Sequence, residues 1–390
     1  MKTNTPDTTF HTDQVATIAG GHFTHDSYSA FLSPLLPLLQ ERLSTNYALT
    51  GSLAIFAQLP SLLNPFIGYL ADRISLRYFI IFAPAITGTL MSSIGLTSNY
   101  VMLAMLLVAV GFSIAMFHAP APAMIARVSG NRVGKGMSVF MAAGEMGRTL
   151  GPIVAVAGVG WFGLDGLWRM AFVGWAVSGV LYLRLRHVAA RPHGKANVST
   201  ATFWPKARRL FPIFAWLMVS RVLMSASITT YLPLYVKDVR EGSLWLAAAA
   251  LTILEGAGVV GALMAGTLSD KLGRVRVLLV LTAVSATIML AFLYAPNWMI
   301  VPLLISLGLT AISPQPVLLA IVQDEFTDNR ALANGSYLAL NFTVRAMGIW
   351  IIGMLADQIG LENAFLIGSL IMFTGIPAVI VLGKKAESVQ

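Results

Sequence analysis

Long apolar stretches follow one another along almost the whole chain, and short polar segments separate them. An apolar stretch of about 18 or more residues is long enough to cross a bilayer as a helix. The pattern predicts twelve such spans, at 14–39, 47–70, 78–97, 101–126, 137–162, 168–186, 210–236, 245–267, 276–295, 298–322, 332–356 and 361–383. One long polar stretch separates the first six from the last six. The sequence therefore predicts an all-α integral membrane protein whose parts are a six-helix bundle at 1–183, a linker at 184–209 and a second six-helix bundle at 210–390.

The composition agrees with a membrane protein and excludes an ordinary soluble one. Of the 390 residues, 56% are hydrophobic and only 11% are charged, whereas about a quarter of the residues in a typical soluble domain are charged. The mean hydropathy is +0.74. Twelve spans leave about 32 residues for each span with its loop, so we expect no extramembrane domain. The chain has no cysteine, which excludes disulfides and thiolate metal sites.

The formal net charge of +9 follows from where lysine and arginine lie. Most of them are at the termini, in the linker and in the loops that follow even-numbered spans. Because positively charged loops stay in the cytoplasm, we expect both termini and the linker on the cytoplasmic side of the inner membrane, next to lipid headgroups. The first dozen residues lack the pattern of a signal peptide, so we expect the N-terminus to be retained. This distribution argues against a nucleic-acid partner.

The two predicted halves repeat each other. Four landmarks recur at offsets of 194 to 198 residues, and they pair Leu36-Pro37 with Leu232-Pro233, Gly68 with Gly266, Pro120 with Pro314, and Arg148 with Arg345. In transporters built from repeated halves, the substrate site lies near the bilayer midplane and one half rocks against the other. The repeat therefore predicts alternating access.

The segment after the eighth span carries a recognisable motif. It reads Gly266-Thr267-Leu268-Ser269-Asp270-Lys271-Leu272-Gly273-Arg274. It resembles the cytoplasmic loop signature of the major facilitator superfamily, G-x-L-x-D-[RK]-x-G-R. The matching segment after the second span has Ser75 in place of the glycine and keeps Gly68, Leu70, Asp72, Arg73 and Arg77. The resemblance covers almost the whole chain, and it implies a monomeric twelve-helix carrier of a small molecule rather than an enzyme.

Three clusters of residues in the first half resemble one particular type within this superfamily. They are His22 with Asp26, Phe117-His118-Ala119-Pro120, and Gly144-Glu145-x-Gly147-Arg148. They look most like the fosmidomycin-resistance type of drug efflux protein. The segment Gly147-x-x-x-Gly151-Pro152 resembles part of an antiporter signature, without its trailing Gly-Gly. The resemblance implies efflux of a drug-like solute in exchange for protons.

The two loop segments are candidates for a conformational gate. Gly68 and Gly266 have no side chain, so we expect a neighbouring helix to approach closely there. Asp72 and Asp270 lie just beyond their helices, where each carboxylate can cap a helix or pair with a nearby cation. The alternative is that these are solvated turn charges. The expected gate consists of Gly68, Asp72, Arg73, Arg77, Gly266, Asp270, Lys271, Gly273 and Arg274.

Ionisable residues within the predicted spans are candidates for proton coupling, because a charge in hydrocarbon costs about 2.5–3.5 kcal/mol. His22 and Asp26 are four residues apart and share a helix face, so the protonation of Asp26 responds to the side from which it is exposed. The alternatives are a satisfied hydrogen bond between these two residues and a simple ion pair between Glu145 and Arg148. Glu255 has no charged neighbour in its own span. The proton-coupling candidates are Asp26, His22, His25, Glu255 and Glu145.

Cationic and aromatic residues are candidates for binding the solute. Guanidinium groups bind carboxylates and phosphonates in bidentate geometry, which favours an anionic or amphipathic organic solute. The alternative is that each arginine neutralises an acid of the same protein. The substrate-binding candidates are His118, Arg148, Arg221, Arg345 and Tyr231.

A second function stays open, which is proton-coupled uptake of an organic metabolite or of a metal chelate. In that case the group that meets the chelate is His22, His25, Asp26 and His118. We expect no resident metal ion and no cofactor. The chain has no phosphate-binding loop, so we expect the proton gradient to be the energy source.

Two segments match the glycine pattern of dinucleotide-binding sites, at 158–163 and 256–261. Neither follows a predicted strand, as such a site requires. We therefore expect these glycines to allow close packing between membrane helices.

Overall fold

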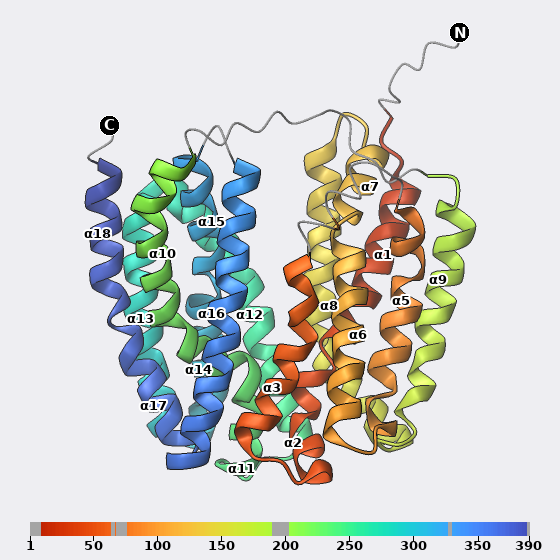
Figure 1. Cartoon of the computed structure of the whole chain (residues 1–390), viewed down its shortest axis with the longest axis horizontal. Helices are drawn as coiled ribbons and strands as arrows, with labels where there is room; N and C mark the ends of the chain where they lie inside the picture. The colour runs from red at the N-terminus through yellow and green to blue at the C-terminus, as the bar shows by residue number, and fades with distance from the viewer. Residues whose placement is uncertain (1–8, 64–66, 68–75, 189–202, 327–329, 388–390) are drawn as a thin grey trace. The chain divides into compact units, whose positions relative to one another are not determined.

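The computed structural model consists of helices joined by short turns (Figure 1), and it describes residues 9–63, 67, 76–188, 203–326 and 330–387. No strand occurs within these ranges, so the all-α prediction is confirmed. The contacts divide the chain into two compact units. One comprises Met1–Leu35 and Phe56–Lys195, and the other comprises Leu36–Ile55 and Ala196–Gln390. The segment Leu36–Ile55 therefore packs with the C-terminal residues, and the division into bundles at 1–183 and 210–390 stays a prediction.

The helices of the first half are α1 (Thr12–Ser29), α2 (Leu32–Leu43), α3 (Tyr47–Gln58), η1 (Leu59–Leu63), α5 (Arg77–Ser92), η2 (Ile94–Leu96), α6 (Tyr100–His118), α7 (Ala121–Val128), α8 (Val133–Phe162), η3 (Leu167–Met170) and α9 (Ala171–Leu185). Those of the second half are α10 (Phe203–Ala226), η4 (Ser227–Tyr231), α11 (Leu232–Asp238), α12 (Leu244–Leu272), α13 (Arg274–Tyr294), η5 (Asn297–Met299), α14 (Ile300–Leu307), η6 (Gly308–Ile312), α15 (Pro314–Glu325), α16 (Arg330–Ile359), α17 (Leu361–Met372) and α18 (Gly375–Glu387). Within the described ranges, 8 helical segments are long and apolar enough to cross a membrane. The count of twelve spans stays a prediction.

Prolines interrupt two predicted spans of the first half. The span expected at 14–39 is divided between α1 and α2, and the break comes just before Pro34. Proline cannot donate the backbone hydrogen bond to the residue four positions earlier, and its ring clashes with that carbonyl. The span expected at 101–126 is divided in the same way at Pro120, between α6 and α7.

In the second half, Pro233 and Pro314 follow short π-helical segments. The segment η4 ends two residues before Pro233, and η6 ends two residues before Pro314. A π-helical turn pairs each carbonyl with a more distant N–H and is often found at functional sites. Pro120 therefore follows a break in the first half, whereas its counterpart Pro314 follows a widened turn in the second. Pro37, the counterpart of Pro233, lies inside α2.

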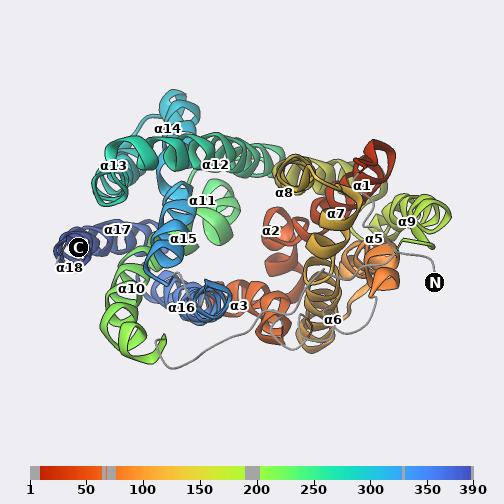
Figure 2. The same ribbon diagram turned by 90° about the horizontal axis from the view of Figure 1, so that it is seen from above.

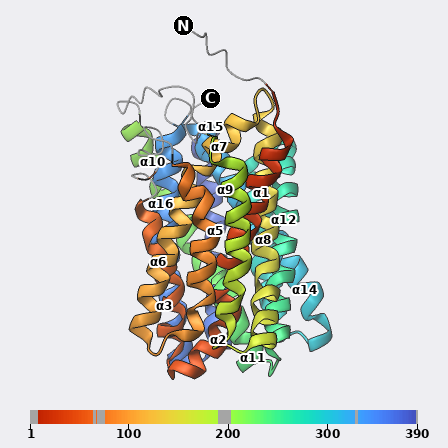
Figure 3. The same cartoon turned by 90° about the vertical axis from the view of Figure 1, so that its right-hand side faces the viewer.

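Within the first unit, α1 runs alongside α8 and α9 (Figure 3). Glycines of α8 face α1. A Cβ atom on Gly147 would collide with the carbonyl oxygen of Phe23, and one on Gly151 would lie 2.6 Å from the carbonyl oxygen of Ser27. Small residues let two helix backbones approach closely in membrane proteins. This close approach brings the polar side chains of α1 and α8 within hydrogen-bonding reach of each other.

Within the second unit, α15 lies between α12 and α16 (Figure 2). The long helix α12 packs against η6 through two glycines. A Cβ on Gly258 would lie 2.5 Å from Ile312 Cδ1, and one on Gly261 would lie 2.5 Å from the carbonyl oxygen of Leu309. In the first unit, a Cβ on Gly158 would lie 2.9 Å from Leu167 Cδ1. The expectation that these glycines serve helix packing is confirmed for Gly158, Gly258 and Gly261. Gly163 instead ends α8 with φ of +72°, and no described atom lies within 4 Å of a Cβ placed there.

Candidate functional site

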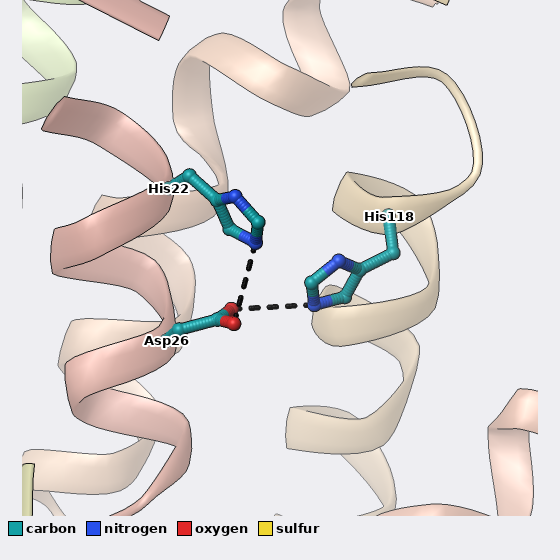
Figure 4. Close-up of side chains that lie close together, drawn as sticks. All are labelled: His22, Asp26 and His118. Atoms are coloured by element: carbon teal, nitrogen blue, oxygen red, sulfur yellow. Dashed lines mark ion pairs between the residues drawn. The ribbon is translucent and has the colours of Figure 1, made fainter. Parts of the chain in front are cut away.

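Asp26 on α1 is the centre of a buried polar network in the first unit. Its side chain is buried, and the imidazole rings of His22 and His118 both point at its carboxylate (Figure 4). His22 Nε2 lies 3.3 Å from Asp26 Oδ2, and His118 Nε2 lies 3.3 Å from Asp26 Oδ1. Arg148 Nη1 donates a hydrogen bond to Asp26 Oδ2 at 3.0 Å. The structure thus joins residues that the sequence had assigned separately to proton coupling and to solute binding.

Three helices position these side chains. His22 and Asp26 are one turn apart on α1, as the spacing predicted. His118 is the last residue of α6, which ends where Pro120 interrupts the span. Arg148 reaches Asp26 from α8 across the interface that the glycines of α8 keep narrow.

A second carboxylate joins the network from α8. Glu145 forms an ion pair with Arg148 one turn away, so the intrahelical pair considered from the sequence does exist. Arg148 is nevertheless shared, because it binds Asp26 as well. Two carboxylates therefore share one guanidinium, and with both histidines neutral these residues carry one net negative charge. A single bound proton would neutralise them.

The backbone carbonyl of Phe140 fixes the protonation pattern of His22. His22 Nδ1 lies 2.8 Å from this oxygen, and a carbonyl oxygen only accepts, so Nδ1 carries the hydrogen. In a neutral His22, Nε2 then presents a lone pair to the carboxylate of Asp26. Among the described residues, neither His22 Nε2 nor Asp26 Oδ1 has a hydrogen-bond partner. The lone pair of His22 Nε2 and those of the Asp26 carboxylate, whose Oδ2 is 3.3 Å away, repel each other. A proton or another cation at this point would therefore stabilise the contact between His22 and Asp26.

His25 lies beside the network but makes different contacts. It is buried, and its Nδ1 is 3.1 Å from Thr87 Oγ1, which in turn is 2.7 Å from Ser113 Oγ. Its ring stacks on Phe117, with the centroids 4.4 Å apart. Because Phe117 immediately precedes His118, His25 supports the end of α6 that carries His118. Sequence reasoning missed Thr87 and Ser113, since isolated hydroxyl residues in apolar spans give no distinctive signal.

The remaining candidates for the proton and the solute belong to the second unit. Arg221 on α10 donates from Nη2 to the carbonyl oxygen of Ala311 in η6, at 3.0 Å. Arg345 on α16 has its Nη2 3.5 Å from Thr229 Oγ1. Glu255 is a half-buried residue of α12. Among the described residues, Arg221 is therefore bound to a backbone carbonyl and forms no ion pair with an acid.

Tyr231 differs from the other substrate-binding candidates, because it is 0% exposed. Its hydroxyl oxygen lies 2.8 Å from the carbonyl oxygen of Ile349 and 3.2 Å from that of Tyr47. The ring also fills the space above Gly51, where a Cβ would collide with the hydroxyl. In this structure Tyr231 holds helices together and offers no surface to a solute.

The second loop segment forms an ion-pair cluster at the end of α12. Arg274 pairs with Asp270 at 3.1 Å and with Asp324 on α15 at 2.5 Å. Gly273 joins α12 to α13 with φ of +93°, a conformation that other residues rarely adopt. No atom of the described residues lies within 4 Å of a Cβ placed on Gly266, so the close approach of a described helix that we expected there is wrong.

The other gate residues give less information. Lys271 is an exposed residue of the last turn of α12. In the first loop segment, Gly68, Asp72 and Arg73 lie outside the described residues. Arg77 is the first residue of α5, and its guanidinium lies 5.2 Å from the ring centre of Tyr78. The gating role of both segments stays a prediction.

Sequence reasoning missed a second polar cluster, which lies within the second unit. Asp357 on α16 accepts hydrogen bonds from the backbone N–H groups of Tyr47, at 2.7 Å, and of Ala48, at 3.0 Å. It therefore caps the N-terminus of α3, where a negative charge is favourable. The hydroxyl of Tyr47 donates to Asp238 at 3.0 Å. Both acids fall one or two residues beyond a predicted span, so they resembled ordinary loop residues.

Comparison with known proteins agrees with this architecture. The curated relatives include the fosmidomycin resistance protein of Escherichia coli (strain K12), which is 25% identical over 371 residues that cover 92% of this chain and 90% of the relative. An uncharacterized MFS-type transporter of Bacillus subtilis (strain 168), YfnC, is 21% identical over 370 residues, with the same two coverages.

Solved structures show the same fold. The nucleoside transporter NupG superposes with a TM-score of 0.75 at 15% identity, over 95% of this chain and 99% of that one. A D-xylose–proton symporter superposes with a TM-score of 0.70 at 17% identity, over 94% of this chain and 95% of that one. The family model of the Major Facilitator Superfamily matches residues 18–327 and 257–389. The chain is therefore a membrane transporter, not an enzyme, and it belongs to the Major Facilitator Superfamily, with a resemblance to the fosmidomycin-resistance type.

Proposed function

We propose that this chain is a proton-coupled secondary transporter that exports a small organic solute, anionic or amphipathic, by alternating access. Asp26 carries the proton, together with His22 and His118, and Arg148 takes part in binding the solute. The observation that carries the proposal is the charge of the network, in which two carboxylates share one guanidinium. A net charge inside a membrane protein is costly, so the carrier reorients most readily when a proton or a solute has neutralised it.

Export is supported by the resemblance to a relative named for fosmidomycin resistance. In an exchanger, the proton and the solute must compete for the carrier. An amphipathic solute with a cationic group would compete in this way, because it supplies the positive charge that the proton otherwise brings to Asp26. The energy comes from the proton gradient, and no cofactor takes part.

Uptake is the second candidate function, and the exposure of Arg148 favours it. The side chain of Arg148 is 41% exposed and that of His118 is 34% exposed, whereas Asp26 is buried. A carboxylate or phosphonate of the solute can therefore replace Asp26 as the partner of Arg148. Asp26 would then lose its cation and take up a proton, so an anion and a proton would bind together and move in the same direction.

The experiment uses purified protein in proteoliposomes with an imposed pH gradient, and a panel of labelled organic acids and growth inhibitors. Solute binding is measured at two pH values on the same preparation. Tighter binding at high pH identifies exchange, whereas tighter binding at low pH identifies cotransport. Flux that ignores the pH gradient for every transported solute would contradict proton coupling.

The proposal places the chain in the inner membrane with both termini in the cytoplasm. A reporter fused after Gln390 or inserted near Gly194 should report the cytoplasm, and a reporter near Asn99 should report the opposite side. A reversed result at Gly194 would contradict the assignment of six spans to each half.

A further inference from the structure

Three side chains of the Asp26 network present metal-ligand atoms to one another. The ligand atoms of His22, Asp26 and His118 all lie within 4.8 Å of one another. Both imidazole nitrogens that face the carboxylate are Nε2 atoms, and each lies 3.3 Å from one of its two oxygens. A charge-assisted N–H···O hydrogen bond is shorter, at about 2.7–2.9 Å. Both contacts are therefore longer than charge-assisted hydrogen bonds.

The spacing matches the edges of a tetrahedral metal site. Zinc binds histidine nitrogen and carboxylate oxygen at about 2.0–2.2 Å, so neighbouring ligands of a tetrahedral ion lie about 3.3–3.6 Å apart. For an ion bound through Asp26 Oδ1, the distance of 3.3 Å from His118 Nε2 falls within this range. His22 Nε2 lies 3.3 Å from the other oxygen, Oδ2, and the ligand atoms of the three residues lie within 4.8 Å of one another. His118 is 34% exposed and ends its helix, which gives its ring freedom to close the remaining edge.

His22 is oriented as a metal-ligating histidine usually is. Such a histidine donates its other ring N–H to a backbone carbonyl or a carboxylate, which fixes the tautomer and the ring plane. His22 Nδ1 makes this bond to the carbonyl oxygen of Phe140, and the two rings stack with centroids 3.9 Å apart. The Nε2 lone pair therefore points at the site, and within the described residues neither it nor Asp26 Oδ1 has a hydrogen-bond partner.

Arg148 limits where an ion can lie. Its Nη1 binds Asp26 Oδ2 at 3.0 Å, and its other terminal nitrogen binds Glu145. An ion bound through Asp26 Oδ1, the oxygen that faces His118, leaves these contacts in place. Glu145 offsets the positive charge of the guanidinium.

We propose that His22, Asp26 and His118 form a binding site for a divalent transition-metal ion of the zinc class. Two imidazoles and one carboxylate suit zinc, nickel or copper, whereas magnesium and calcium prefer oxygen ligands. Three protein ligands leave the fourth position of a tetrahedral ion to water or to an oxygen of the solute. The ion binds the same nitrogen and oxygen atoms of His22, Asp26 and His118 that otherwise bind the proton, so binding of the metal and binding of the proton exclude each other. The site rests on ligand geometry and holds for either direction of transport.

The test measures Zn²⁺ binding to the purified, tag-free full chain by calorimetry, at constant pH and without solute. We expect one Zn²⁺ per chain, and no competition from a large excess of Mg²⁺. Co²⁺ should give the intense visible absorption of a tetrahedral complex. His118→Gln, at a half-exposed residue that can change without disturbing the core, should weaken Zn²⁺ binding at least about tenfold, since even the residues that orient ligands contribute that much.

His187→Gln is the matched control, because His187 is an exposed histidine at the end of α9. It should leave Zn²⁺ affinity unchanged. Asp26→Asn should weaken binding as His118→Gln does, and a thermal melt of each variant checks that it is folded. Equal Zn²⁺ affinity in wild type and His118→Gln, or the same loss in His187→Gln, would overturn the proposal. Because no solute and no pH gradient are used, a negative result here leaves the proposed transport function standing.

Discussion

Replacing Asp26 with asparagine should separate proton coupling from solute movement. The amide has the size of the carboxylate and mimics its protonated form. Its oxygen can accept from Arg148, as Asp26 Oδ2 does at 3.0 Å, while its NH₂ group can donate to His118 Nε2 in place of Oδ1. The variant removes one negative charge, so Glu145 and Arg148 balance each other. We expect the network to stay permanently in the state that the proton otherwise produces.

The structure sets the expected magnitudes. A hydrogen bond to a charged group contributes about 1.5–3 kcal/mol and a neutral one about 0.5–1.5 kcal/mol, so Asp26→Asn should lower the free energy of unfolding by about 1–2 kcal/mol. The effect on transport is far larger. A gradient of one pH unit supplies about 1.4 kcal/mol per proton, which drives about a tenfold accumulation at one proton per solute. The variant should accumulate nothing.

The assay compares pH-driven accumulation with exchange of labelled for unlabelled solute in the same proteoliposomes. Exchange should persist in Asp26→Asn, because it needs only the conformational change with solute bound. Glu255→Gln is the comparison variant, since Glu255 is the other acidic candidate and lies on α12 in the second unit. Proton-driven accumulation that survives Asp26→Asn but is lost in Glu255→Gln would refute the reasoning and place coupling in the second unit.

Three further predictions concern the contacts around this site. Gly147→Ala should lower stability by about 1–3 kcal/mol, since its Cβ would collide with the Phe23 carbonyl. Gly179→Ala is the control: no described atom lies within 4 Å of its Cβ, so it should be neutral or stabilising in thermal melts. Asp357→Ala should remove the cap of α3, which contributes about 1–2 kcal/mol to the stability of that helix end. Hydrogen exchange of the Tyr47 and Ala48 amides should therefore become about 5–30-fold faster, and unchanged exchange would contradict the capping role. Asp270→Asn should slow flux but leave equilibrium solute binding intact, because Asp270 is exposed and, among the described residues, pairs only with Arg274, the first residue of α13; equal flux would remove the gating role.

Much of the fold and half of the site follow from the sequence for simple physical reasons. The pair of His22 with Asp26 was predictable because residues four apart share a helix face. The contact of Arg148 with Asp26 was not, since it depends on which face of α8 meets α1, and that face is set by glycines whose partners lie more than a hundred residues away. A single hydropathy pattern records how apolar a span is and not which of its sides faces another helix.

Other features were hidden for different reasons. The break between α1 and α2 could have been expected from Pro34, but membrane helices tolerate proline when their neighbours satisfy the freed backbone groups. The carbonyl oxygen of Phe140 fixes the tautomer of His22, and a backbone atom has no sequence signal at all. The solute-binding role of Tyr231 stays a prediction, and its burial in this structure was not predictable, because an aromatic residue at a binding surface and one in a packed core look the same in a sequence.

The attachment of Leu36–Ile55 to the second unit has a consequence for biosynthesis. The residues at the start of α3 leave the ribosome 310 residues ahead of Asp357, the carboxylate that caps them. At about 5–20 residues per second, translation of that stretch takes about 15–60 s. During this time Asp357 of α16 cannot cap α3. The C-terminal residues against which Leu36–Ile55 packs have not yet been synthesised. If the two halves are expressed separately, they should therefore need to associate during or soon after synthesis. The first half alone lacks the C-terminal residues against which its segment Leu36–Ile55 packs.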